Sequence, residues 1–230
     1  MSYIYLGRRR PGFTKAAPRE VEFIELPPAS HAQVLMAASL LLDYPGPEFP
    51  ERLRAVEVET RSLPRPVAQC FEVFCAWARE AGLRGVEESY VATFDERRRC
   101  ALELSYYAVG DTRQRGQALL AFRELYRRAG FDQNDGELPD YLPAILELCA
   151  KCQNVDVTNV LPAHRDALEV LRTALFQLGS PWENVITAVC YVLPSIEEET
   201  KQRYQRLIRQ GPPSELVGIT DLPFPTEARS

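Results

Sequence analysis

Apolar residues recur every three or four positions along most of this chain, which is the period of an α-helix with one buried face. In the clearest stretch, residues 67–81, Phe71 and Phe74 lie on the apolar stripe, and Gly82 follows where a left-handed residue can end a helix. No proline occurs among the 72 residues 67–138. Because proline breaks helix interiors, this stretch favours long helices.

The same period continues in other segments, each of which is predicted to be a helix. These segments are residues 30–43, 49–60, 86–94, 96–109, 112–129, 141–152, 163–178, 181–193 and 196–210. Gly179 follows one of them and can end it, because glycine has no Cβ that opposes positive φ. Ser30 with Gln33, and Ser180 with Glu183, have the spacing of a capping box, which is typical of a helix start.

Alternating strand patterns are nearly absent, and the one candidate, residues 21–26, has no second strand with which to pair. We therefore expect an all-α fold with a single compact multi-helix domain at residues 30–211. Residues 1–29 hold five basic residues and four prolines and are predicted to be a flexible basic arm. Residues 212–230 are predicted to be a loose, proline-containing tail.

Composition and charge narrow the classes of partner. Hydrophobic residues make up 46% and charged residues 26% of the chain, as in ordinary soluble globular proteins. The net charge of -5 argues against a nucleic-acid partner, which would require a basic surface. The longest uncharged apolar runs are about 11 residues, well short of the roughly 18 that a membrane span needs. The first residues lack a secretory signal pattern, so we expect a cytoplasmic protein without membrane insertion.

Motifs for catalysis are missing. The chain has two histidines, and it contains no nucleophile elbow, Walker loop, dinucleotide fingerprint or zinc-protease motif. No catalytic residue is predicted, and His164 is interpreted as an ordinary residue of a helix start. Cys149 and Cys152 have a metal-like or redox-like spacing, but no second pair or nearby histidine completes four metal ligands. We interpret them as buried thiols, with a redox pair or a metal site as the alternatives.

A polar stretch, residues 90–116, joins the longest predicted helices and allows two interpretations. In the structural one, Gly110 ends the previous helix, Asp111 or Thr112 caps the following one, and Gly116 lets a neighbouring helix approach closely. In the functional one, the arginines and tyrosines of the stretch line a binding site. A second motif follows at 137–143, where Asp140 is predicted to cap a helix from an exposed loop, a position that would suit a basic peptide.

These motifs resemble the NarJ branch of the redox-enzyme maturation chaperones. The resemblance covers roughly residues 31–194 and is carried by Tyr90-x-x-x-Phe94-Asp95-x-x-Arg98-Arg99-Cys100, Tyr106-Tyr107, Gly110-Asp111-Thr112-Arg113-x-Arg115-Gly116 and Glu137-Leu138-Pro139-Asp140-Tyr141-Leu142-Pro143. The family's Glu-x-Pro-Asp-His loop maps onto the last of these, where Tyr141 replaces the commoner histidine. A phenol can still supply a hydrogen-bond donor at that position.

The resemblance implies a dedicated chaperone without catalytic activity that serves nitrate respiration. Such proteins bind the N-terminal segment of the apo catalytic (alpha) subunit of membrane-bound nitrate reductase, keep it competent for molybdopterin cofactor insertion, and delay membrane docking until assembly is complete. Related branches serve trimethylamine-oxide and dimethyl-sulfoxide reductases. No permanently bound cofactor or metal is expected.

The resemblance also supplies the candidate peptide-binding residues. They are Tyr90, Phe94, Asp95, Arg98, Tyr106, Tyr107, Asp111, Arg113, Arg115, Glu137, Pro139, Asp140 and Tyr141. We expect an amphipathic client segment to lie in a groove between helices, with apolar anchors inside and polar residues at the rim. Two alternatives stay open: a generic helical adaptor, and a cofactor-handling protein that uses Cys149 and Cys152 or Cys100 as active thiols.

The N-terminal arm also has two interpretations. Val21, Phe23 and Leu26 alternate with glutamates, so the arm resembles the kind of peptide that a helical groove accepts. It is either a solvated extension or an internal ligand that competes with an incoming segment.

Overall fold

The computed structural model describes residues 18–109, 115–132, 136–152 and 154–194, together with residues 198 and 202. Helices account for most of these residues, and no strand forms within this part of the chain. One antiparallel bridge joins Glu103 to Tyr141. The prediction of an all-α fold is confirmed.

The helices follow one another along the chain with short connections. In order they are α1 (Pro28–Leu42), α2 (Phe49–Glu59), the 3₁₀ turn η1 (Thr60–Ser62), α3 (Arg65–Tyr90), the π-helix η2 (Val91–Asp95), the 3₁₀ turn η3 (Arg98–Cys100), α4 (Leu104–Val109), α5 (Arg115–Ala129), α6 (Leu142–Lys151), α7 (Val155–Thr158), α8 (Val160–Ala163), α9 (Arg165–Leu178) and α10 (Trp182–Val192). The pattern of apolar residues does not predict the short helices α7 and α8. The helix expected over 196–210 lies outside the described residues, except for 198 and 202.

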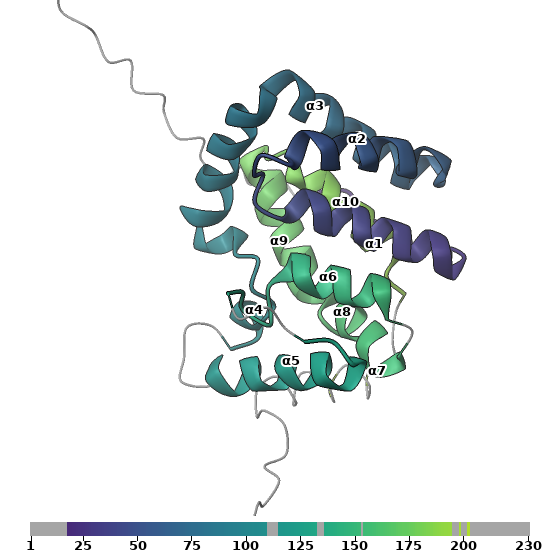
Figure 1. Ribbon diagram of the computed structural model, residues 1–230, viewed down its shortest axis with the longest axis vertical. Coiled ribbons are helices and arrows are strands. Elements are labelled where there is room, and N and C mark those ends of the chain that lie inside the picture. The colour runs from purple at the N-terminus through teal and green to yellow at the C-terminus, as the bar shows by residue number, and fades with distance from the viewer. Residues whose placement is uncertain are drawn as a thin grey trace, which may run out of the picture.

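The helices α1 and α10 form the centre of the core. α1 packs against α2, α6 and α10, and α10 also packs against α3 and α9. Figure 1 shows α1 between α2 and α6, with α5 at one end of the molecule. Seven of the 11 residues of α10 are buried, so this helix is surrounded on more than one face, as a central core helix must be.

Gly82 divides α3 into two helical parts. Its φ of 66° and ψ of 168° lie outside the helical region, in a region that is essentially restricted to glycine. The predicted break at Gly82 is therefore confirmed, although the chain returns to a helical conformation directly afterwards. The second part of α3 continues into the π-helix η2, which the apolar periodicity does not predict.

Replacing Gly82 with alanine is expected to lower the free energy of unfolding by about 1–3 kcal/mol, because the backbone conformation opposes a side chain. Among the described residues, an added Cβ meets no heavy atom within 4 Å at Gly82 or at Gly116, so the close helix approach predicted at Gly116 is wrong. Gly116 lies in α5 without positive φ, and Gly116→Ala should raise stability by up to about 1 kcal/mol. Urea unfolding of both variants checks that the two substitutions change stability in opposite directions. Equal unfolding midpoints would contradict this prediction.

The predicted helix over 96–109 is wrong in its first half. Helix α4 starts only at Leu104, whose N–H donates to the carbonyl of Asp140 at 3.0 Å. The carbonyl of Leu102 accepts the N–H of Leu142 at 2.8 Å. Backbone groups that form hydrogen bonds with a distant loop are not available for the hydrogen bonds of a helix. This pairing therefore keeps residues 101–103 outside a helix.

The two predicted capping boxes do not form. α1 begins before Ser30, and the side-chain amide of Gln33 donates instead to the carbonyl of Glu59 at 2.6 Å. The N-cap residue of α10 is Pro181, and the buried hydroxyl of Ser180 has no hydrogen-bond partner in the described part of the chain. Prolines stand at both helix starts, where their fixed φ suits the first turn. The predicted end at Gly179 is confirmed, since its φ of 68° and ψ of 29° are left-handed.

Residues 18–27 precede α1 and pack against the body of the protein. Val21 is buried, and Ile24 and Leu26 are partly buried against the core. The predicted flexible arm thus extends too far toward α1, because its last part belongs to the packed structure. Its first 17 residues and the predicted tail lie outside the described residues.

Candidate partner-binding surface

Three of the predicted site residues meet where α3, η2 and the start of α6 come together. The centroid of the Tyr90 ring lies 4.7 Å from that of Phe94, and the Tyr90 hydroxyl is 3.0 Å from that of Tyr141. The Tyr90 hydroxyl also donates to the carbonyl of Leu42 at 3.1 Å. Because a phenol has one proton, Tyr141 supplies the donor between the two tyrosines. This is the donor expected from the phenol that replaces the family's histidine.

The aromatic cluster is structural support rather than contact surface. Tyr90 is 5% exposed and Phe94 is 8% exposed. Both rings pack against Trp182, with centroid distances of 5.7 Å and 5.3 Å. Burial raises the pKa of the Tyr90 and Tyr141 phenols, which therefore stay protonated at neutral pH. Half-buried Tyr141 also lines a surface hollow.

Asp140 has a different role from the one predicted. It is fully buried, and its Oδ2 accepts hydrogen bonds from the N–H and the hydroxyl of Ser105. Ser105 lies in the first turn of α4, so the carboxylate caps α4 from a distant loop. Helix α6, which Asp140 was expected to cap, has Tyr141 as its N-cap residue and no side-chain cap. A buried carboxylate cannot contact a peptide on the surface.

The remaining candidate residues do not gather on one surface. The Tyr107 hydroxyl donates to the carbonyl of Ala101 at 2.8 Å, holding the chain between η3 and α4. The others differ in burial: Asp95, Arg98 and Glu137 are exposed, Tyr106 and Arg115 are half-buried, and Pro139 is buried. Asp111 and Arg113 lie outside the described residues.

Two surface hollows flank α6 and meet at the 137–141 loop. The first, of about 180 Å³, lies between α1, α2 and α6 and is lined by Met36, Ser39, Leu40, Asp43, Arg52, Glu137, Tyr141, Pro143, Ala144 and Glu147. The second, of about 230 Å³, lies between α5 and α6 and is lined by Tyr126, Phe131, Asp132, Glu137, Leu138, Ala144, Glu147, Leu148 and Lys151. Both are lined by Glu137, Ala144 and Glu147. We call this pair of hollows the α6 groove.

The α6 groove combines acidic side chains with apolar ones. Its four carboxylates face two basic side chains, and both of these are paired: Arg52 Nη1 lies 2.7 Å from Asp43 Oδ2, and Lys151 pairs with Glu147. The pKa of Glu137 is raised, first by partial desolvation of its carboxylate and then by the charges of Asp43 and Glu147. That shift indicates a concentration of negative charge. Phe131 and Leu138 are 37% and 42% exposed at the second hollow, where they offer apolar contact area.

The cysteines do not form an evident redox centre. Cys149 is buried, and its thiol donates to the carbonyl of Val157 at 3.4 Å. Burial raises the pKa of Cys149 and raises that of Cys100 to about 11, which disfavours the reactive thiolate. Among the described residues, no group of three or more potential ligands could hold a metal ion. Within the same residues, no helix has the length and apolar character to cross a bilayer.

The nitrate reductase delta subunit family model matches residues 60–188. This range runs from η1 into α10 and includes the 137–141 loop and α6. The chain belongs to the nitrate reductase delta subunit family. The resemblance to NarJ-type chaperones that the sequence motifs indicate is thereby confirmed.

Curated relatives of this delta-subunit-family protein differ in how much of their own length is matched. The nitrate reductase-like protein NarX of Mycobacterium tuberculosis (strain ATCC 25618 / H37Rv) is 33% identical over 157 residues, which are 68% of this chain and 24% of NarX. The probable nitrate reductase molybdenum cofactor assembly chaperone NarJ of Bacillus subtilis is 28% identical over 165 residues, 70% of this chain and 88% of that protein.

A third relative is found in Escherichia coli K12. Its nitrate reductase molybdenum cofactor assembly chaperone NarJ is 27% identical over 149 residues, 64% of this chain and 63% of that chaperone. The chain therefore spans about a quarter of NarX and somewhat under two thirds of this NarJ.

Most of the α6 groove in this delta-subunit-family chain was not predicted from the sequence. Among its lining residues, only Glu137 and Tyr141 were candidates. Met36 and Leu40 have the pattern of ordinary core positions in an amphipathic helix, and Glu147 has that of a solvated charge. These residues come together because of the way α1, α5 and α6 pack. The sequence of one segment does not predict that packing.

Proposed function

We propose that this protein is a dedicated assembly chaperone that binds the apo catalytic (alpha) subunit of a membrane-bound respiratory nitrate reductase. It holds the N-terminal segment of that subunit, supports insertion of the molybdenum cofactor, and delays membrane docking until assembly is complete. Family membership carries the proposal, because two of the relatives are named as nitrate reductase molybdenum cofactor assembly chaperones. The chaperone acts in the cytoplasm.

The α6 groove is the place where we expect the client segment to bind. Its two hollows lie side by side along α6 and share Glu137, Ala144 and Glu147 as lining residues, so together they suit a segment longer than a single side chain. The exposed apolar side chains Phe131 and Leu138 give contacts for apolar anchors. The carboxylates at the rim favour a segment with a basic residue. This recognition is of the helix-in-groove kind.

The proposed action has no covalent step. The molybdenum cofactor is cargo of the client, and the chaperone keeps the client open until the cofactor is in place. A cofactor-handling protein with active thiols is disfavoured by the buried, high-pKa thiols of Cys149 and Cys100. A generic helical adaptor would share the groove but would lack preference for the reductase.

Neutralising two groove carboxylates is expected to weaken binding of the client segment. The variant Glu137→Gln/Glu147→Gln should raise the dissociation constant of a synthetic peptide of that segment by about 3- to 10-fold, since each rim charge contributes modestly. The difference from wild type should shrink as salt rises, because exposed charges are screened. Isothermal titration calorimetry at low and high salt measures both effects.

Glu80→Gln/Glu88→Gln is a matched control, since both are exposed glutamates of α3 that do not line the groove. If the control weakens peptide binding equally, the loss of affinity is caused by net charge and not by contacts in the groove. Co-purification from cells that express the nitrate reductase operon separates the dedicated chaperone from a generic adaptor. Recovery of other proteins without the catalytic subunit would contradict the proposed client.

A further inference from the structure

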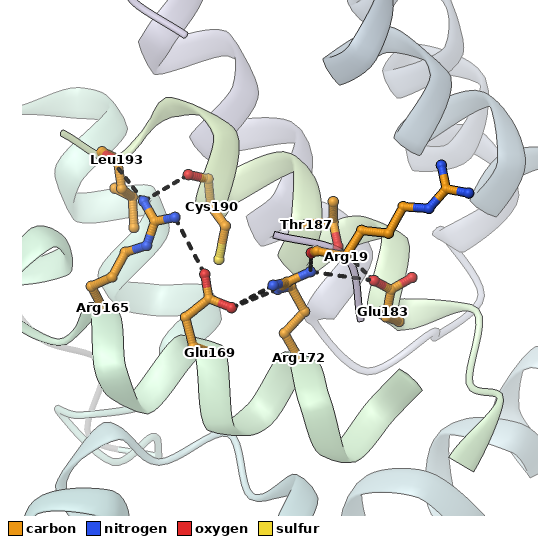
Figure 2. Close-up of polar contacts among 8 residues, drawn as sticks. All are labelled: Arg19, Arg165, Glu169, Arg172, Glu183, Thr187, Cys190 and Leu193. Atoms are coloured by element: carbon orange, nitrogen blue, oxygen red, sulfur yellow. Dashed lines mark hydrogen bonds and ion pairs between the residues drawn. The ribbon is translucent and has the colours of Figure 1, made fainter. Parts of the chain in front are cut away.

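A charged network joins α9 to both ends of α10. Arg165 Nη1 donates to the carbonyls of Cys190 and Leu193, each at 2.9 Å. Glu169 lies between Arg165 and Arg172, and its Oε2 is 2.6 Å from Arg172 Nη2. Figure 2 shows these three side chains in a row along α9, facing α10. The network orders Arg172 in a fixed position.

Arg172 holds the backbone of the N-terminal segment. Its Nη1 donates to the carbonyl of Arg19 at 2.9 Å, although the two residues are 153 positions apart in the chain. The Arg172 side chain is only 6% exposed, and Glu183 Oε1 lies 3.9 Å from the same Nη1. A buried guanidinium costs free energy unless its charge and its donors have partners. The network provides the charge partner, and the segment provides a carbonyl acceptor.

The rest of the segment is attached at a few points. The N–H of Ile24 donates to the carbonyl of Tyr191 at 2.7 Å, in the last turn of α10. Carbonyls of that turn lack partners within the helix, so another element must satisfy them. Val21, Ile24 and Leu26 point toward the core, whereas Phe23 is 48% exposed. Glu22 and Glu25 are also exposed.

We propose that the face of α9 and α10 beneath residues 18–27 is a second peptide-binding site, which the protein's own N-terminal segment occupies. The site takes a non-helical stretch of polypeptide with apolar residues at its first, fourth and sixth positions, in the spacing of Val21, Ile24 and Leu26. Arg172 binds a backbone carbonyl of the guest, and the Tyr191 carbonyl accepts an N–H. This site lies away from the α6 groove and does not depend on the proposed client.

The segment can exchange because only Val21 is buried in it, with Ile24 and Leu26 partly buried. Regions with few buried apolar contacts open at a free energy far below that of global unfolding. The covalent link to α1 keeps the segment at an effective concentration of about millimolar or higher. A guest must compete with that concentration, so the intact protein binds a free peptide weakly.

The test uses the full chain and a labelled peptide with the sequence of residues 18–27. In the full-length variant Ile24→Asp, the internal segment is released, and the peptide should bind at least about tenfold more tightly than it binds to wild type. Phe23→Asp is the matched control, since Phe23 faces outward in the same segment, and it should behave as wild type. Fluorescence anisotropy measures all three dissociation constants.

A further substitution locates the binding. In the Ile24→Asp background, Arg172→Met removes the donor to the guest carbonyl and should weaken the peptide about tenfold or more. Circular dichroism establishes that the variants are folded. A folded Ile24→Asp protein that binds the peptide no better than wild type overturns the proposal, and so does binding that is indifferent to Arg172.

Hydrogen exchange of the wild-type protein tests the same proposal if Ile24→Asp does not fold. The amide of Ile24 should exchange at least about tenfold faster than the core amides of α10, because the segment opens locally. An Ile24 amide that exchanges as slowly as those core amides contradicts a displaceable segment.

Discussion

Replacing Trp182 with alanine is expected to lower the free energy of unfolding by about 4–5 kcal/mol, near the upper end of what the truncation of a core aromatic residue costs. Trp182 is fully buried at the start of α10. Its ring packs against Phe74, Trp77, Tyr90 and Phe94 at centroid distances of 5.3–5.7 Å. Alanine would leave a cavity among four aromatic rings that belong to α3 and η2.

A lost hydrogen bond is part of this expected total and places it near the upper end of the range. The indole Nε1–H of Trp182 donates to the carbonyl of Leu41 at 3.0 Å in a buried position. Trp182→Ala leaves that carbonyl without its partner, which costs about 1–3 kcal/mol in buried surroundings. Urea unfolding followed by circular dichroism at 222 nm measures the total.

Trp77→Ala is a suitable control for the aromatic cluster. Trp77 contacts Phe74 and Trp182 but is only partly buried, so its truncation should cost less than that of Trp182. A loss for Trp77→Ala equal to or above that for Trp182→Ala would contradict the central position of Trp182.

Asp140→Ala is expected to lower the free energy of unfolding by about 2–4 kcal/mol, because the N–H and the hydroxyl of Ser105 both lose their acceptor inside the protein. An exposed helix cap, the role predicted from sequence, would cost about 1 kcal/mol. The measured size of the loss therefore distinguishes the two roles. Asp140→Asn keeps one carbonyl acceptor and should recover part of the stability in the same urea titration.

The consequence of Asp140→Ala for the α6 groove follows from the same contacts. The Asp140 backbone and side chain fasten the loop that carries Glu137 and Tyr141 to the start of α4. Loosening that loop should weaken the client peptide as well as the fold. Weaker peptide binding with an unchanged urea midpoint would instead place Asp140 at the contact surface, against its full burial.

The period of the apolar residues was enough to predict the helical class and most helix positions. Periodic apolar residues depend on local geometry, since positions three or four apart share a face whatever the helix packs against. Gly82 and Gly179 were correctly predicted as breaks because left-handed φ is a property of the single residue. Motif spacing in residues 90–143 was specific enough to indicate the family, which the family model confirms.

The roles of several other residues depend on how distant segments pack together. The carboxylate of Asp140 caps α4 across 35 positions, and the guanidinium of Arg172 holds a carbonyl 153 positions away. Partners so distant in the chain come together only through helix packing. The pattern of residues along the sequence does not indicate which distant residues will pair. The α6 groove is of the same kind, because residues of α1, α5 and α6 form its walls only when these helices pack together.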